Sequence, residues 1–391
     1  MIKSFGIFYA GHIELDNIGF SGTPANERWY ANKQLAEVFD TSLDIAKLSD
    51  RLGYDILWLA EHHFQREGYE CIPNILMLSI HLANHTQRVK YGCGFNILPM
   101  WHPLRLAEDF ATADILTGGR VIFGIGRGYH SREVETAGAP ALDPDANREL
   151  FEEQLEIIVK AFNEDPFSHQ GKHYTLPPRI PYRGYELENL TLVPRPVHRP
   201  VEIWQPVVSG NPRGLKFMFK HNIKGVVSGF PTSTVDRIFR LFQEAGTHEG
   251  LNLELGENLA LGLRFLLFDS QKEAVKATKA AYEEGLKFSG PLGFMPGLTE
   301  EQKNAAINPK EKGATFFPTL EDGIKDGQWI CGSSDVAIAT LKEIEEKYPG
   351  LEHVFFNVSV GANKAFFMEQ LERFGREVMP AFINEQTHIK H

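Results

Sequence analysis

Short β-rich runs alternate with longer helical runs along almost the whole chain, and this alternation constrains the fold more than any other feature. The β-rich runs predict eight strands, at 4–10, 55–60, 89–98, 120–126, 201–207, 224–228, 259–268 and 353–359. Apolar residues at helical spacing predict helices between and after them, at 43–53, 74–85, 104–119, 148–162, 212–222, 234–245, 271–288, 334–348 and 363–379. Eight β-α units favour a closed (β/α)8 TIM barrel over an open doubly wound sheet.

Two segments interrupt the alternation, and both are rich in Pro and Gly. Residues 163–200 form an excursion between predicted strands four and five, and residues 289–328 form an insertion between strands seven and eight. Nothing divides the chain into two halves, and barrels with insertions can reach 391 residues. We therefore expect one elaborated domain spanning residues 1–391.

The composition argues against several classes of partner. The formal net charge is −11 and no block of Lys and Arg occurs, which argues against binding of a nucleic-acid backbone. Cys71, Cys93 and Cys331 are far apart, so neither a disulfide framework nor a zinc site is predicted. The apolar run at the N-terminus is too short for a signal peptide or a membrane span. We expect a cytoplasmic protein that binds neither nucleic acid nor membranes.

The stretch WLAEHHF ends the predicted second strand and places Glu61, His62 and His63 at the catalytic face of the barrel. Adjacent strand residues point to opposite sides, so the two histidines are poorly placed to share a metal ion. His81 and His85 have a possible ligand spacing on a helix, but a solvated helix face explains them more simply. Because imidazole titrates near neutral pH, the cluster favours acid-base chemistry, with a loop pair of no function as the alternative.

Two glycine-containing stretches follow the fourth and fifth strands. The first, 124-GIGRGYHSRE-133, is one residue short of a dinucleotide fingerprint, which disfavours a nicotinamide dehydrogenase. Its Arg127 could pair with a phosphate or lie at the surface of a Gly-rich turn. In the second, 208-VSGNPRG-214, Ser209 and a helix start predict an anion site to which Arg213 could add charge. The alternative is that Ser209 or Asn211 only caps the helix.

Four segments together resemble the bacterial luciferase-like family of flavin-dependent monooxygenases. They are 58-WLAEHHF-64, 98-LPMWHPLRLAEDFATADILTGGR-120, 121-VIFGIGRG-128 and 372-ERFGREVMP-380. The resemblance implies a barrel whose largest insertion lies between strands seven and eight. It also implies reduced FMN, delivered by a separate flavin reductase, and O2 that adds at the flavin C4a carbon to give a peroxyflavin. That species oxygenates a small organic substrate such as an aldehyde or ketone. A homodimer through the helices near strands two and three is expected as well.

The resemblance assigns roles to individual residues. His62 matches the family's catalytic histidine and Glu133 its acidic neighbour, while a non-proline cis peptide is expected at Gly94–Phe95. The expected cofactor-binding residues are Glu61, Gly94, Phe95, Asn96, Arg127, Gly128, Tyr129, Val208, Ser209, Gly210 and Arg213. No metal site is expected.

Two departures from the family pattern affect these expectations. Gly126 replaces the cysteine of luciferase, so light emission does not follow from the resemblance. Pro212 stands near the position of a phosphate-binding hydroxyl, which either leaves the phosphate site weaker or makes Arg213 a replacement.

The sequence is also compatible with other functions. A deazaflavin-dependent oxidoreductase would use the same fold, although E-H-H-F together with the R-G turn favours FMN. A non-catalytic flavin-binding partner subunit is less consistent with the retained His62 and Arg127. Aromatic and apolar residues of two loops suggest an apolar substrate pocket, or loops that pack on themselves. These residues are Phe20, Trp29, Tyr30, Phe294, Met295, Phe316 and Phe317.

Overall fold

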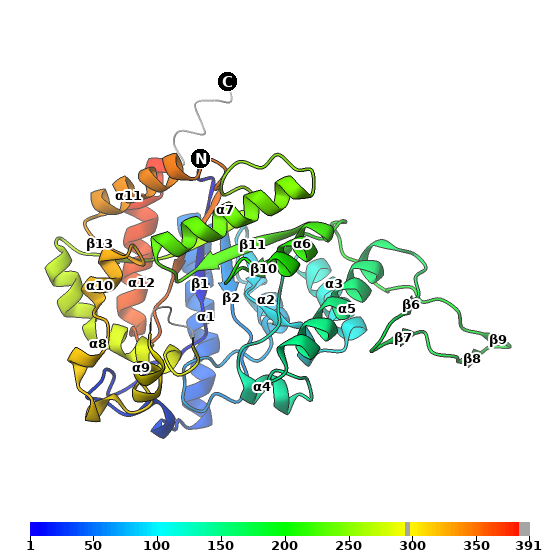
Figure 1. Ribbon diagram of the computed structural model, residues 1–391, viewed down its shortest axis with the longest axis horizontal. Coiled ribbons are helices and arrows are strands. Elements are labelled where there is room, and N and C mark those ends of the chain that lie inside the picture. The colour runs from blue at the N-terminus through cyan, green and yellow to red at the C-terminus, as the bar shows by residue number, and fades with distance from the viewer. Residues whose placement is uncertain (294–297, 383–391) are drawn as a thin grey trace.

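The computed structural model describes residues 1–293 and 298–382, and its centre is a closed barrel of parallel strands (Figure 1). Each strand pairs with the next around the ring, and pairing between the eighth and the first closes it. The predicted (β/α)8 barrel is confirmed. Its strands are β1 (Ser4–Tyr9), β2 (Ile56–Leu59), β3 (Lys90–Cys93), β5 (Val121–Gly126), β10 (Ile203–Pro206), β11 (Ile223–Ser228), β12 (Leu259–Leu267) and β14 (His353–Asn357).

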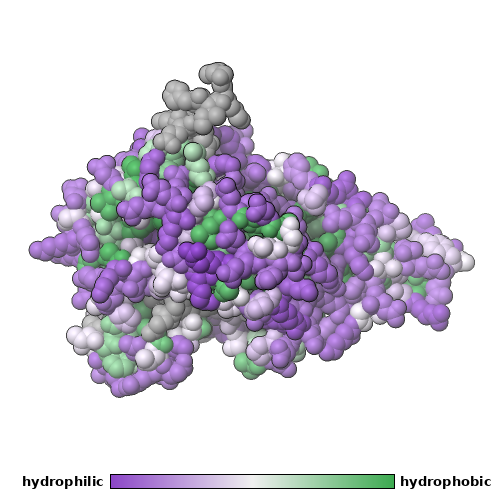
Figure 2. All heavy atoms as spheres, turned by 45° about the horizontal axis from the view of Figure 1, so that its top comes forward, coloured by the Kyte–Doolittle hydropathy of each residue, from purple (hydrophilic) through white to green (hydrophobic). Residues whose placement is uncertain are grey.

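Helices pack around the outside of the barrel. Those that follow the strands are α1 (Asn32–Leu52), α2 (Ile75–Ala83), α3 (Pro103–Leu116), α4 (Ser131–Thr136), α5 (Pro144–Asn163), α6 (Pro212–Lys220), α7 (Thr232–His248), α8 (Gln271–Ser289), α11 (Ser334–Lys347) and α12 (Lys364–Arg373). The last helix continues as a short π-helical segment, Phe374–Val378. No helix within residues 1–293 and 298–382 is long and apolar enough to cross a membrane, and the face in Figure 2 is largely hydrophilic.

Alternate residues of the strands fill the barrel interior. Trp58 on β2 and Trp204 on β10 meet there edge to face, with ring centroids 5.8 Å apart. A Cβ on Gly92 would lie 2.2 Å from the Trp58 ring, so β3 needs glycine at this place. The remaining members of this apolar cluster are Ile56, Ile122, Val226, Ala260 and Phe355. Because large side chains fill the barrel, a ligand has room only at its mouth.

Two predicted elements had wrong bounds, and one strand was missed. The first helix begins at Asn32, not near residue 43; its first turns are mostly exposed, and Leu35 and Val38 alone give too weak an apolar pattern to mark them. The predicted strand 89–98 is split into β3 and a short β4 (Asn96–Ile97). The peptide bond between them, Gly94–Phe95, is cis, as predicted. A further strand, β13 (Trp329–Gly332), pairs with β12 and was not predicted.

The two interrupting segments have different roles. The excursion carries two hairpins, made of β6 (His169–Gln170) with β7 (Thr175–Leu176) and β8 (Pro181–Tyr182) with β9 (Tyr185–Glu186), which project from the barrel in Figure 1. The insertion carries α9 (Glu300–Ala305) and α10 (Leu320–Lys325) and lies between β12 and β14, as predicted.

The loop after β1 and the insertion share a second apolar cluster. Phe20 packs against Phe317 with ring centroids 4.6 Å apart, and both side chains are buried. Trp29 lies on the surface against Arg66, whose guanidinium is 4.1 Å from the ring centroid. For these residues the loops pack on themselves, which was the second of the two expectations. Phe294 and Met295 lie outside the described residues.

Candidate active site

His62 lies just past the end of β2, at the barrel mouth, and is buried. Its Nδ1 is 3.3 Å from Oε2 of Glu133, which is carried by the short helix α4 after β5. The pairing expected from the sequence is therefore present. Gln65 supports it, because its Nε2 donates to Glu133 Oε1 at 3.1 Å.

A second carboxylate faces the other ring nitrogen of His62. Glu70 Oε1 lies 3.1 Å from His62 Nε2, and the Tyr129 hydroxyl donates to the same oxygen at 3.0 Å. Glu70 Oε2 lies 3.0 Å from Nε2 of His130. Glu70, 4% exposed, was missed in the sequence, as were Gln65 and His130. We refer to these six residues together as the His62 network: His62, Gln65, Glu70, Tyr129, His130 and Glu133.

The electrostatics of this network favour a protonated His62. Burial by itself lowers the pKa of the ring, but the charge of Glu70 and the hydrogen bond to Glu133 outweigh it and raise the pKa above its ordinary value. The same hydrogen bond holds the pKa of the Glu133 carboxyl low against the opposing effect of burial. Because both ring nitrogens face carboxylate oxygens, an imidazolium suits the site better than a neutral ring.

His63 and Glu61 belong to a separate contact. His63 Nε2 lies 3.1 Å from Glu61 Oε1, which also accepts a hydrogen bond from the Trp101 indole at 2.8 Å. Glu61 Oε2 accepts from the backbone N–H of Ile97 at 3.1 Å. The two adjacent histidines thus face different carboxylates, and Glu61 is occupied with shaping the strand ends.

One group within the described residues has the composition of a metal site. Ligand atoms of His62, Glu70 and His130 all lie within 4.8 Å of one another. Each of them already has a hydrogen-bonding or ion-pair partner inside the His62 network. The contacts present therefore account for the group without an ion.

An arginine cluster lies near the ends of β5 and β10. Arg127, partly buried, makes one long hydrogen bond, from Nη1 to the Pro144 carbonyl at 3.4 Å. Burial lowers the pKa of Arg127, and the nearby charges of Arg148 and Arg213 lower it further. Glu152 offsets part of this charge, through Arg213 at 2.7 Å and Arg148 at 3.9 Å. Three guanidinium groups around one carboxylate form a donor set that suits a phosphate.

The loop that precedes α6 completes this side of the mouth. The Asn211 side chain caps the helix by accepting from the N–H of Gly214 at 3.3 Å, so Ser209 is not the cap. The Ser209 hydroxyl makes no hydrogen bond to the described part of the chain, while its carbonyl accepts from Arg237 at 3.1 Å. Val208 is 55% exposed, and Gly210 has a φ of +65° that favours glycine.

Glycines and the cis peptide shape the wall between β3 and β5. A Cβ on Gly124 would lie 1.7 Å from the Cys93 carbonyl oxygen, so the backbones come into close contact there. Asn96 is buried and its Nδ2 donates to the Gly124 carbonyl at 2.9 Å. Phe95 is partly buried against the barrel interior. Gly128 has a φ of +79°, a conformation that brings Tyr129 round toward the His62 network.

The tertiary structure therefore brings together the ends of β2, β3, β5 and β10 at one mouth. Of the predicted residues, His62, Glu133 and Tyr129 are in direct contact, and Arg127 and Arg213 share the arginine cluster. Arg148 was missed because it lies on a helix face with no motif around it. Gln65 and Glu70 follow the E-H-H-F motif within a few residues, which is the only sequence signal that could have indicated them.

The comparison with protein families identifies one match over most of the chain. The family model described as luciferase-like monooxygenase matches residues 18–349. Among curated relatives, the oxygenase component of the flavin-dependent trigonelline monooxygenase of Acinetobacter baylyi is 26% identical over 361 residues. The alignment covers 91% of this chain and 93% of that relative.

Solved structures of the same fold carry two kinds of cofactor. The oxygenating constituent of 3,6-diketocamphane monooxygenase from Pseudomonas putida, in complex with FMN, has a TM-score of 0.72 at 19% identity and covers 97% of this chain and 98% of its own. An F420-dependent secondary alcohol dehydrogenase has a TM-score of 0.66 at 16% identity. The superposition covers 97% of this chain and 99% of the dehydrogenase chain. At these identities the likeness shows the fold alone.

Proposed function

Because the chain belongs to the family of luciferase-like monooxygenases, we propose that it is the oxygenase component of a two-component flavin-dependent monooxygenase. It receives reduced FMN from a separate flavin reductase and uses O2 to oxygenate a small organic substrate, such as an aldehyde or ketone. The observation that carries the proposal is the His62 network at the same barrel mouth as an arginine cluster. The trigonelline relative is named an oxygenase component, which supports an external supply of reduced flavin.

The residues at the mouth fit FMN. Arg127 and Arg213, with Arg148 and the Ser209 hydroxyl, offer donors for the phosphate. The Gly94–Phe95 wall with Asn96, together with the backbone of Gly128 and of 208–210, provides close backbone approach for the ring system. Reduced FMN, when bound, supplies the electrons that activate O2. Glu61 acts indirectly, by holding the strand ends that form this wall.

His62 supplies a proton and a positive charge. With Nδ1 held by Glu133, the ring keeps a fixed orientation, and the Nε2–H, which faces Glu70, can donate its proton to an oxygen anion that forms on that side of the ring. The two carboxylates favour this role over that of a free base, because a neutral ring is disfavoured between them.

An apolar side chain on α8 borders the His62 network. Phe288 stacks on Tyr69 at 4.8 Å and lies 6.3 Å from His130, so it limits the access of water to this edge of the network. Exclusion of water protects a reactive oxygen species from unproductive loss.

Replacement of His62 tests the proposal. We expect His62→Ala to bind reduced FMN normally but to lose product formation by about 100-fold or more and to release hydrogen peroxide instead, because general acid-base groups contribute this much. Single-turnover mixing of the reduced enzyme with O2 and a panel of aldehydes and ketones measures both. Product and peroxide yields equal to those of the parent protein would contradict the assignment.

A deazaflavin-dependent oxidoreductase is the second candidate, since a fold neighbour uses F420. Equilibrium binding of reduced FMN against reduced F420 separates the two, and FMN is expected to bind at least tenfold more tightly because the arginine cluster suits a terminal phosphate. A non-catalytic flavin-binding subunit would instead bind FMN without any turnover.

A homodimer is part of the proposal. Helices α2 and α3 expose Met77 (70%) and Leu116 (61%), apolar side chains that a dimer interface through these helices would cover. Light scattering is expected to give twice the chain mass, and Met77→Glu to shift it toward the monomer.

A further inference from the structure

Arg264 lies on β12, the seventh strand of the barrel, close to its carboxyl end. Residues two apart on a strand face the same side. Ala260 belongs to the interior cluster, and a Cβ on Gly262 would meet the Phe355 ring at 2.5 Å, so this side of β12 faces the barrel axis. Phe265 faces outward, with its ring 4.6 Å from that of Phe374. Arg264 is therefore the inward-facing residue of β12 at the mouth.

The guanidinium of Arg264 has no anionic partner in the described part of the chain. It makes no hydrogen bond or ion pair with residues 1–293 or 298–382, and its nearest aromatic contact is the Trp329 ring, 5.4 Å from Cζ. Both Nη atoms lie 3.5 Å from the position of a Cβ on Gly229, which places them against the turn after β11. The side chain is partly buried, and burial lowers the pKa of Arg264.

Arg28, a buried arginine of the same chain, has the anionic partner that Arg264 lacks among the described residues. Arg28, 3% exposed, pairs with the carboxylate of Glu284 at 2.9 Å and receives further support from the Tyr69 and Tyr30 hydroxyls. Burial of a charge is costly unless it is paired. Arg264 carries part of this cost with no anionic partner among the described residues, and it does so at the barrel mouth.

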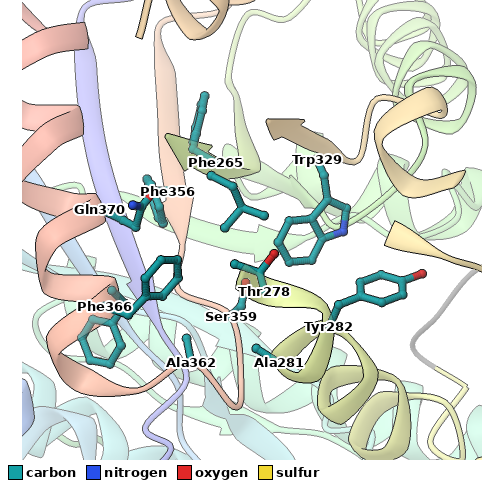
Figure 3. A pocket seen from close by; sticks show the side chains of 12 residues that line it. Phe265, Thr278, Ala281, Tyr282, Trp329, Phe356, Ser359, Ala362, Phe366 and Gln370 are labelled. Carbon is teal, nitrogen blue, oxygen red and sulfur yellow. The ribbon is translucent and has the colours of Figure 1, made fainter. Parts of the chain in front are cut away.

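We propose that Arg264 binds the carboxylate of the substrate, so that the oxygenated molecule is a small organic anion. This inference rests on the proposed monooxygenase function and narrows its substrate class. A guanidinium matches a carboxylate with two parallel hydrogen bonds. The neighbouring Trp329 and Tyr282, both labelled in Figure 3, meet edge to face with ring centroids 5.9 Å apart and form an apolar wall for the body of the molecule.

Two other features agree with this position. The cavity in Figure 3, which Trp329 and Tyr282 help to line, has a volume of only about 20 Å³, enough for about one water molecule, so it has no room for the body of a substrate. On β12, Arg264 is separated by β11 from the strands that carry the phosphate site. The anion it binds is therefore different from the FMN phosphate.

The test uses benzoate as a flat carboxylate and benzamide as its neutral match. Anaerobic equilibrium dialysis against the enzyme loaded with reduced FMN is expected to show benzoate bound at least about tenfold more tightly than benzamide. Arg264→Met is expected to abolish this preference by weakening benzoate binding about tenfold or more while leaving benzamide unchanged. Arg264→Lys is expected to keep part of the preference, and Arg376→Met, which removes an exposed surface arginine, to keep all of it.

Several outcomes would overturn the inference. One is equal binding of benzoate and benzamide by the parent protein, and another is unchanged benzoate binding in Arg264→Met. If Arg264→Met instead loses affinity for reduced FMN, the anion is the reduced flavin and not the substrate. Reduced-FMN binding and O2 consumption by the parent protein, measured in parallel, report on the monooxygenase function itself and separate its failure from that of the carboxylate site.

Discussion

At the ends of β2 and β5 two cationic side chains have opposite electrostatic surroundings. His62 lies between Glu70 and Glu133, whereas Arg127 lies beside two further arginines and has no carboxylate within 4.0 Å among the described residues. The first arrangement is balanced by the protein, so it keeps a proton in place. The second has excess positive charge, which a bound anion can balance.

The same contrast separates the buried Arg28 from the partly buried Arg264. Arg28 is held by Glu284 and joins the loop after β1 to α8, together with Lys287 at 2.6 Å from the same carboxylate. Within residues 1–293 and 298–382, Arg264 makes only an aromatic contact. Paired cations thus stabilise the fold, and unpaired ones mark positions where a ligand supplies the charge.

The largest effect is expected on folding stability. Arg28→Met removes one of the two cations that balance the negative charge of the buried Glu284. The free energy of unfolding should therefore fall by about 3–5 kcal/mol. Arg264→Met removes a cost, so it should leave this free energy unchanged or raise it. Urea denaturation measures both, with Arg376→Met as a surface control. An equal loss in Arg264→Met would show that Arg264 has a structural partner and would remove the contrast.

The next effect is expected on cofactor affinity. Arg127→Met removes a partly buried member of the arginine cluster and should weaken binding of reduced FMN about 100-fold, since charge-assisted hydrogen bonds to phosphate are strong. Anaerobic fluorescence titration measures the dissociation constant. A riboflavin titration is the matched control, because without a phosphate the parent protein and the variant should bind it alike. Equal losses for FMN and riboflavin would place Arg127 outside the phosphate site.

The smallest effect is expected on pH dependence. The pKa of His62 is raised, so its protonated form is present below that pKa and is lost as pH rises through it. Glu70→Gln removes a negative charge and lowers the pKa of His62, so the alkaline limb of the activity profile should move to lower pH and activity above it should fall several-fold. The contribution of this proton to stability follows the same direction, being complete at low pH and lost as pH rises.

Glu133→Gln is the companion variant for this profile. It should shift the limb in the same direction and in addition loosen the ring orientation, which lowers activity at every pH. If Glu70→Gln leaves the alkaline limb of the activity profile at the same pH, Glu70 only holds His130 and Tyr129 in place and does not control the protonation of His62.

Much of the barrel could be predicted from the sequence. Its strands are apolar runs bounded by loops, and this signal is local, so a strand lies at each of the eight predicted places, although the third is split into β3 and β4. The early turns of α1 were missed because they are mostly exposed and carry few apolar residues, and β13 because a four-residue strand carries little periodicity. These elements depend on their neighbours for stability and not on their own pattern.

The site divides in the same manner. Sequence motifs identified His62, Glu133, Arg127 and the Gly94–Phe95 bond, because each lies in a short stretch at a strand end. Their pairing distances could not be read from motifs, nor could the role of Ser209, which leaves the helix cap to Asn211.

The sequence by itself determined the alternation of strands and helices, and therefore the barrel and the mouth at which the motifs meet. Only the tertiary structure decided which charges are balanced. Glu133 meets His62 and Glu284 meets Arg28 across loops and helices, while Arg264 meets no carboxylate in the described chain. The physical reason is that a residue's charge is set by its type, but the free energy of that charge depends on burial and on partners that lie far away in the sequence.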